Sequence, residues 1–133
     1  MNPAELDIKD MLVADGVVTF KTDFFIGPLP DEPSLGAAIQ AYSNMSYNPL
    51  TDAATLSELM VNINVRGPAS EAGYKQSYAL AETISAGMVA VIHRSQAGMS
   101  YTVKKTNGPF SIGRDDRNRP LWSVNFRVWR NVV

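Results

Sequence analysis

The densest charge in the chain lies in the segment "GRDDRNR", residues 113–119. Its two acids, Asp115 and Asp116, are of a type that binds calcium. An EF-hand loop also needs a central glycine and a distal glutamate, which are missing here. Three arginines surround the acids instead: Arg114, Arg117 and Arg119. This pattern favours an exposed hairpin tip of mixed charge over a metal loop.

Arginines and aromatic residues are interleaved in the next stretch, "PLWSVNFRVWRNVV", as in proteins that bind single-stranded nucleic acid. In a strand, however, every second residue from Trp122 to Val128 shares one apolar face. That face is suited to a protein core. Leu121, Arg127 and Trp129 fall on the other face. We therefore interpret most of this stretch as a core strand.

The other residues able to do chemistry are few. Cysteine is absent, which excludes disulfides, thiolate nucleophiles and cysteine-based zinc sites. His93 is the single histidine, and we expect it at the end of a helix, where it interacts with the helix dipole. Asp31 and Glu32 adjoin prolines, where neighbouring acids usually face solvent. We therefore predict no enzyme, no cofactor and no metal site.

Length and composition predict one domain over residues 1–133. Apolar residues make up 45% and charged residues 19% of the chain, as in globular proteins. The formal net charge of −1 lacks the basic surplus that DNA-binding proteins usually carry. The first residues lack the pattern of a signal peptide, and the longest apolar runs are too short for a bilayer. We expect no membrane association.

Two helices are predicted. The first covers residues 2–15, with Asn2 as N-cap and Pro3 in the first turn. The second covers residues 70–95, with Ser70 as N-cap. Its apolar stripe has helical spacing and consists of Tyr74, Tyr78, Ala81, Ile84, Met88 and Val91.

The rest of the chain predicts strands joined by loops. Segments with strand character are residues 17–27, 36–43, 56–67, 99–113 and 120–133. Three prolines make residues 27–36 a surface loop, residues 44–55 are expected to be irregular, and Asn107-Gly108 predicts a turn. This order predicts an α+β fold: a mixed, mainly antiparallel β-sheet with two helices packed on one face.

Some apolar side chains fall on strand faces opposite the predicted core, namely Phe25, Met60, Leu121 and Trp129. Exposure of such residues to water is costly. Two explanations have equal weight: another subunit covers this face, or the proline-rich loop of the same chain does. We expect contacts between subunits or with partners at Phe25, Pro28, Asp31, Glu32, Met60, Arg114, Asp115, Asp116, Arg117, Arg119, Leu121 and Trp129.

The ordered series of motifs resembles a known family. These motifs are "LDIKDMLVADGV", "IGPLPDEPSLGAAIQAY", "VNINVRG", a helix with "YKQSYALAETI", and "GPFSIGRDDRNRPLWSVNFRVW". Together they span the chain from Leu6 to Trp129. In order and spacing they look like the tail terminator proteins of long-tailed bacteriophages, also labelled tail completion or minor capsid proteins.

The resemblance implies a virion structural protein of the tail and neck, assembled in the host cytoplasm. Such subunits form a homo-oligomeric ring, generally a hexamer, on the tail tube protein. The ring stops tube growth and offers a docking surface to the head-tail connector or stopper protein. DNA passes through the lumen without specific binding, and neither catalysis nor a cofactor is implied.

Two alternatives stay open. One is a neighbouring neck protein, such as a head-closure or connector subunit, which also forms rings. The other is a nucleic-acid-binding module that uses Arg127 and Trp129 on the C-terminal strand.

Overall fold

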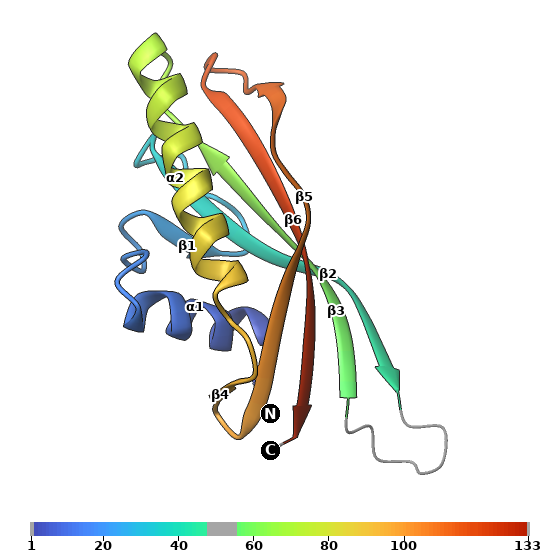
Figure 1. The fold of residues 1–133 in the computed structure, drawn as a ribbon. Helices are drawn as coiled ribbons and strands as arrows, with labels where there is room; N and C mark the ends of the chain where they lie inside the picture. Colours follow the sequence, from blue (N-terminus) through green and yellow to red (C-terminus); the bar gives the residue numbers. More distant parts are fainter. Residues whose placement is uncertain (1, 48–55, 133) are drawn as a thin grey trace.

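The computed structural model describes residues 2–47 and 56–132. The elements are α1 (Ala4–Ala14), β1 (Phe24–Ile26), β2 (Gly36–Tyr47), β3 (Leu56–Arg66), α2 (Glu71–Val89), β4 (Arg94–Gln96), β5 (Met99–Arg114) and β6 (Pro120–Val132). The described strands form one sheet in the order β1-β2-β3-β6-β5-β4. Among the described strands, only β1 and β2 pair in parallel. Figure 1 shows both helices on one side of this twisted sheet, so the predicted α+β fold is confirmed.

The core lies between the helices and one face of the sheet. Alternate residues of the central strands β3 and β6 are buried, as their period of two predicts: Leu59, Val61, Ile63, Val65, Trp122, Val124, Phe126 and Val128. The helices contribute Ile8, Met11, Leu12, Ala81, Ile84 and Met88. Burial of one such aliphatic side chain contributes about 1.5–3 kcal/mol. The inner face of the sheet therefore carries both helices: α2 lies over β5, β6 and β3, and α1 lies beside β1 and β2.

The first helix begins differently from the prediction. Helix α1 starts at Ala4 after Pro3, and no side chain caps it. Asn2 is not the N-cap, because its amide Nδ2 donates to Asp7 Oδ1 at 3.1 Å. Asp7 is itself buried and accepts a second hydrogen bond from the hydroxyl of Tyr101. The need to satisfy this buried carboxylate explains the position of Asn2.

The second helix begins as predicted but ends earlier. The Oγ of Ser70 accepts a hydrogen bond from the backbone N–H of Gly73 at 2.9 Å, which confirms Ser70 as N-cap. Helix α2 ends at Val89, so the prediction that His93 lies in its last turn is wrong. His93 has a φ of 47°, and its backbone N–H donates to Thr102 Oγ1 at 2.9 Å. The chain is already turning into β4 at this point.

The apolar stripe of α2 is shifted in its first turns. Tyr74 and Tyr78 are 41% and 38% exposed, and Gly73 and Ser77 face the sheet in their place. The ring of Trp122 causes this shift: its centroid lies 4.9 Å from that of each tyrosine, and its Nε1 donates to Ser77 Oγ at 2.9 Å. A small residue is needed under the indole, so the tyrosines flank it.

The predicted strand at residues 17–27 is mostly a turn. Only Phe24–Ile26 pair with β2, and Phe20 forms an isolated bridge. Asp23 Oδ1 accepts a hydrogen bond from the backbone N–H of Thr19 at 2.8 Å, and Lys21 has a φ of 65°. Local hydrogen bonds from an aspartate compete with sheet pairing, which explains the loss of the strand.

The predicted turn at Asn107-Gly108 is a bulge. Strand β5 runs unbroken from Met99 to Arg114, with register shifts against β6 around this point. Gly108 has a φ of 96°, and a Cβ there would lie 2.5 Å from the backbone oxygen of Ser123. The glycine therefore allows a close approach to β6 rather than a chain reversal.

Two further predictions concern the ends of the sheet. Residues 36–43 form a strand as predicted, and β2 continues over Asn44–Tyr47, which were expected to be irregular. The remainder of that irregular segment, residues 48–55, lies outside the described residues.

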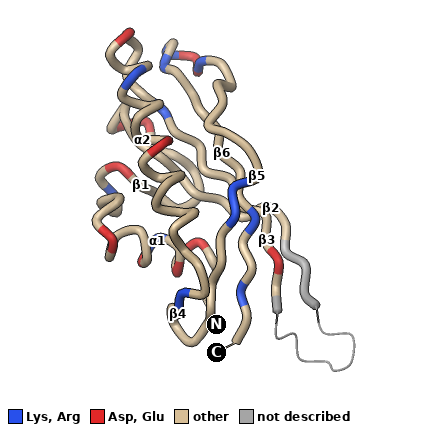
Figure 2. The backbone as a smooth tube through the Cα atoms, in the orientation of Figure 1, with Lys and Arg blue, Asp and Glu red and all other residues tan. Residues whose placement is uncertain are grey.

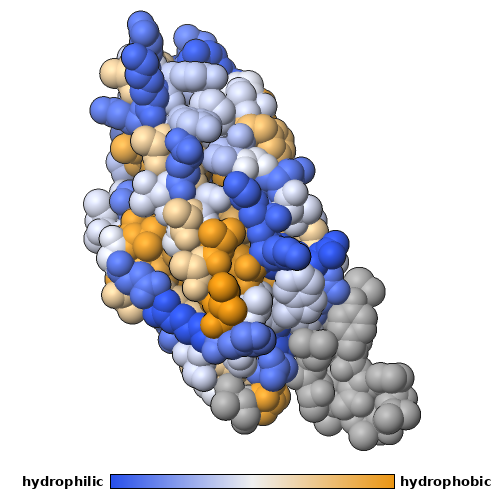
Figure 3. Space-filling model, viewed as in Figure 1, coloured by the Kyte–Doolittle hydropathy of each residue, from blue (hydrophilic) through white to orange (hydrophobic). Residues whose placement is uncertain are grey.

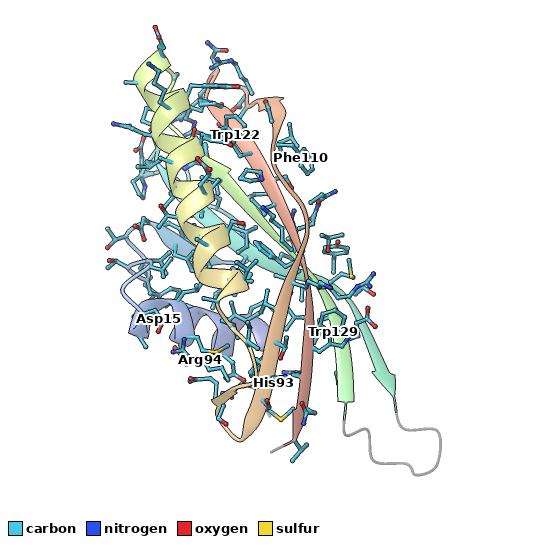
Figure 4. All side chains as sticks on the ribbon, viewed as in Figure 1. Asp15, His93, Arg94, Phe110, Trp122 and Trp129 are labelled. Carbon is cyan, nitrogen blue, oxygen red and sulfur yellow. The ribbon has the colours of Figure 1, made fainter. Side chains whose placement is uncertain are left out.

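An ion pair joins α1 to the edge strand β4. Asp15, after α1, and Arg94 of β4 lie side by side, with Oδ2 and Nη1 2.5 Å apart (Figure 4). None of the described helices is long and apolar enough to cross a membrane.

Candidate functional site

Two loops singled out from the sequence meet at one end of the molecule. The proline loop, residues 27–35, connects β1 to β2, and the hairpin tip, residues 114–119, connects β5 to β6. Figure 1 shows the hairpin tip beside the N-terminal end of α2, at the opposite end from both termini. Arg66, the last residue of β3, lies between the loops. We call these two loops with Arg66 the loop cluster.

Arg66 holds the proline loop through its backbone. The side chain is only 5% exposed, and its Nη2 donates to the carbonyl oxygens of Pro30 at 2.5 Å and Pro33 at 2.8 Å. A longer contact of 3.3 Å joins Nη2 to Asp31 O, and Nε donates to Ser34 O at 3.1 Å. One guanidinium thus binds four carbonyl oxygens of the loop between Pro30 and Ser34.

The amino-acid sequence of the loop makes this arrangement favourable. Pro28, Pro30 and Pro33 have no backbone N–H, so the loop has more acceptors than donors. Arginine supplies five donors and no acceptor, which matches this excess. Burial and the nearby charge of Arg119 lower the pKa of Arg66, but the side chain stays protonated at neutral pH.

Arg119 joins the proline loop to the hairpin tip. Its Nη1 donates to Asp31 O at 2.7 Å, and its Nη2 pairs with Asp31 Oδ1 at 3.0 Å. On the other side its Nε donates to Asp115 Oδ2 at 2.7 Å. The side chain is 6% exposed. Arg119 is therefore an internal link, and the expectation that the whole tip is exposed is wrong at this residue.

Asp115 fixes the shape of the tip. Its Oδ1 accepts hydrogen bonds from the backbone N–H groups of Arg117 and Arg119, each at 2.9 Å. Desolvation alone raises the pKa of Asp115, but the hydrogen bonds from Arg119 and Arg117 outweigh it and bring that pKa below its ordinary value. Desolvation alone lowers the pKa of Arg119, but its hydrogen bonds to Asp115 and Asp31 have the larger effect and bring that pKa above its ordinary value. Each partner favours the charged form of the other.

The outer surface of the loop cluster is polar. Its exposed residues are Pro28, Asp31, Glu32, Pro33, Arg114, Asp116, Arg117 and Asn118. Arg117 Nη1 pairs with Asp31 Oδ2 at 2.7 Å and approaches Glu32 Oε1 to 4.0 Å. Such exposed pairs contribute little to stability, so these charges are available to a partner. Acids and bases alternate at the tip in Figure 2, and Figure 3 shows a mostly hydrophilic surface at this end.

The four apolar residues on the face opposite the core do not share one environment. Phe25 and Leu29 both lie against Gly36, so the proline loop of the same chain covers this part. Leu121 pairs across the sheet with Arg66, at the loop cluster. Met60 and Trp129 lie further along the same face, away from the tip, and both are half-buried. The guanidinium of Arg127 lies 5.9 Å from the Trp129 ring and pairs with Glu58 at 2.8 Å.

Hydrogen bonds between side chains cross the middle of this outer face. Asn62 Nδ2 donates to Ser123 Oγ at 2.7 Å and to Asn125 Oδ1 at 2.8 Å. Asn125 Nδ2 in turn donates to Asn107 Oδ1 at 2.7 Å. The row links β3, β6 and β5. The centre of the outer face is therefore polar, and its apolar residues stand apart from one another.

Arg66 is the residue that reasoning from the sequence missed. By the alternation of β3 it falls on the face opposite the core, and it is not among the residues expected to make contacts. A usable signal was present: a proline-rich loop has spare carbonyls, and an arginine beside a glycine at a strand end is a suitable donor. Within the described residues, no group of three or more histidine, aspartate or glutamate side chains is placed to hold a metal ion.

A family model described as bacteriophage tail terminator protein matches residues 11–130. The chain belongs to the bacteriophage tail terminator family. This membership identifies a virion structural protein, and the virion as its location. Arg66 of "VRG", Asp31 of "LPDEP" and Asp115 of "GRD" lie in this matched range.

The fold is shared with solved structures. Twenty-two chains match, among them one from the "virion of native gene transfer agent (GTA) particle". That chain has a TM-score of 0.64 and 12% sequence identity, over 96% of this chain and 93% of its own length. Such a likeness shows the fold. No curated protein sequence matches.

Replacement of Arg66 tests its role in the loop cluster. We expect Arg66→Met to lower the free energy of unfolding by about 3 kcal/mol, because several carbonyls of the proline loop lose their donor. Urea denaturation measures the change. Arg114→Met is the matched control, since its exposed side chain donates to a single described acceptor, Asn118 O, at 3.0 Å. Equal effects of the two variants would contradict the role of Arg66.

The lowered pKa of Asp115 predicts a pH dependence. Its contribution to stability is present above the ordinary aspartate pKa near 3.8 and is lost as the pH falls through the lower folded-state pKa. Below that ordinary pKa, the urea midpoint of the unmodified chain should fall more steeply with decreasing pH than that of Asp115→Asn. Parallel curves for the two proteins would show that Asp115 has the same pKa in both states.

Proposed function

We propose that this chain forms a ring, as a homohexamer, on the end of a tail tube. The ring stops tube growth and presents a docking surface for the head-side connector or stopper protein. The loop cluster carries this proposal: two loops of mixed charge lie at one end of the subunit, where Arg66 supports the proline loop and Arg119 joins it to the hairpin tip. The proposal contains no catalytic step.

The internal links suit a docking surface because they order it in advance. Binding through a mobile loop has an entropic cost for each side chain and backbone segment that becomes fixed. Here the buried guanidinium groups of Arg66 and Arg119 hold the backbone of the proline loop, and Arg119 binds the Asp115 carboxylate of the tip. Arg117, Glu32 and Asp116 remain exposed. A partner can therefore meet charges that are already in position. Such charges favour specificity and the rate of encounter more than affinity.

Ring closure requires a second set of contacts. Copies in a ring meet through two different surfaces, so residues on the outer face of the sheet are suited to this purpose. The half-buried Met60 and Trp129 are the residues we assign to it. A formal net charge of −1 suits a channel that DNA crosses without specific binding, because strong phosphate contacts would retain the DNA.

The neck and nucleic-acid alternatives make different predictions. A head-closure subunit would bind the portal side and not the tail tube protein. A nucleic-acid-binding module would need the charge of Arg127, which pairs with Glu58 and lies over Trp129. The family match favours the terminator over both.

Charge reversal at the tip tests the proposal. We expect Arg117→Glu to leave the urea midpoint unchanged, because its side chain is exposed, and to reduce joining of heads to tails at least tenfold. Arg119 is left intact because it is internal. Joined particles counted by electron microscopy after complementation measure the effect. The control is Lys75→Glu, an exposed lysine on α2 whose Nζ lies 3.8 Å from Glu71.

The same experiment includes the length of the tails. Tubes assembled without this chain should grow beyond their normal length, and addition of the chain should restore it. Tubes of normal length in its absence would contradict the proposed role as terminator. Normal joining by Arg117→Glu would remove the hairpin tip from the docking surface.

A further inference from the structure

A cavity lies at the other end of the molecule, under the start of α1. Its volume is about 440 Å³. The first turn of α1 forms one side, and residues of β2, β3 and β6 form the rest: Pro3, Ala4, Glu5, Ala41, Tyr42, Ser43, Leu59 and Arg130. It is separate from the loop cluster, with which it shares no residue. Its lining combines apolar side chains with a guanidinium, so it has the make-up of a ligand site.

Arg130 is a buried cation without a carboxylate partner among the described residues. The residue is 5% exposed, and no ion pair joins it to an acid in the parts of the chain that the structure describes. Its Nη1 donates to Asn2 O at 2.9 Å and contacts the hydroxyl of Tyr101 at 3.4 Å. Its Nε is buried and has no hydrogen-bond partner there. A buried charge with neutral partners is costly unless an anion compensates it.

The buried carboxylate of Asp7 does not fill this role. Asp7 accepts hydrogen bonds from the Tyr101 hydroxyl and from Asn2 Nδ2. Burial and the hydrogen bond to Asp7 raise the pKa of Tyr101 to about 12, so the phenol keeps its proton at neutral pH. Tyr101 therefore stands between the two charges: it donates to Asp7 and leaves Arg130 with unused donors.

The start of α1 adds further donors at the same place. Helix α1 has 11 residues and no side-chain cap, and the first N–H groups of a helix carry partial positive charge. Leu6 N donates to Pro3 O at 3.1 Å, whereas no partner within the described residues accepts from the N–H groups of Ala4 and Glu5. Both residues line the cavity. The hydroxyls of Tyr42 and Ser43 belong to the same lining.

We propose that this cavity binds a carboxylate group, which pairs with Arg130 and accepts from the free N–H groups of α1. The volume accommodates the carboxylate with the apolar chain that carries it, which would lie against Leu59 and Ala41. The carboxylate can come from a small organic acid or from an acidic side chain of a neighbouring chain. The chemistry of the site is the same for both, and it does not depend on the loop cluster or on the ring.

Nuclear magnetic resonance tests the proposal on the intact chain. Acetate and a short blocked peptide, acetyl-Gly-Glu-Gly-amide, are titrated at constant ionic strength with chloride. We expect saturable shifts of the Arg130 Nε–H signal and of the Ala4 and Glu5 amide signals. Tenfold tighter binding of the peptide would identify a chain segment as the natural source, and equal affinity would identify a small acid. Absence of saturable shifts with both probes would overturn the proposal.

Variants separate this site from general effects of charge. Arg130→Gln should weaken binding at least tenfold, and the exposed Arg114→Gln should leave it unchanged. Glu5→Gln should strengthen binding about threefold, because it removes a like charge from the lining. This second variant decides the matter if Arg130→Gln does not fold. Unchanged binding by Glu5→Gln, or an equal loss in Arg114→Gln, would contradict the site.

Discussion

The contact between Arg66 and the carbonyls of the proline loop determines how this end of the molecule is built. A loop with three prolines cannot satisfy its own acceptors, and it has no strand partner over most of its length. Arg66 supplies the missing donors from the end of a core strand. The loop then places the carbonyl and carboxylate of Asp31 where Arg119 binds them, and Arg119 holds Asp115. The tip is thus positioned through the loop.

This dependence divides the charged residues into two groups. Arg66, Arg119 and Asp115 face inward and determine the shape of the cluster. Arg117, Glu32 and Asp116 face outward, where their charges are free to meet a partner. Substitution in the first group should affect stability first, whereas substitution in the second should affect assembly alone. Binding and folding are in this way assigned to different side chains of the loop cluster.

The sequence predicts the parts of the fold whose pattern is local. The alternation in β3 and β6 and the N-cap at Ser70 depend on near neighbours, and the structure confirms them. The failures depend on distant partners. Gly108 forms a bulge and not a turn because its backbone passes close to Ser123. Tyr74 and Tyr78 lie to either side of Trp122 and not under it. Asn2 donates to Asp7, a buried carboxylate that also binds Tyr101. The strand expected around Thr19 fails for a local reason, the side chain of Asp23. The site divides in the same way. Both loops were found from composition, but the support from Arg66 and the link through Arg119 join residues more than thirty positions apart.

The central claim is that the proline loop and the hairpin tip are one cooperative unit. A double-mutant cycle with Arg66→Met and Arg119→Met tests it most directly, with the free energy of unfolding measured by urea denaturation. If the loop detaches when Arg66 is lost, the bonds from Arg119 to Asp31 are already broken, and the second substitution should add much less than it does alone. We predict this non-additivity. Strictly additive effects would show that the two loops are held independently.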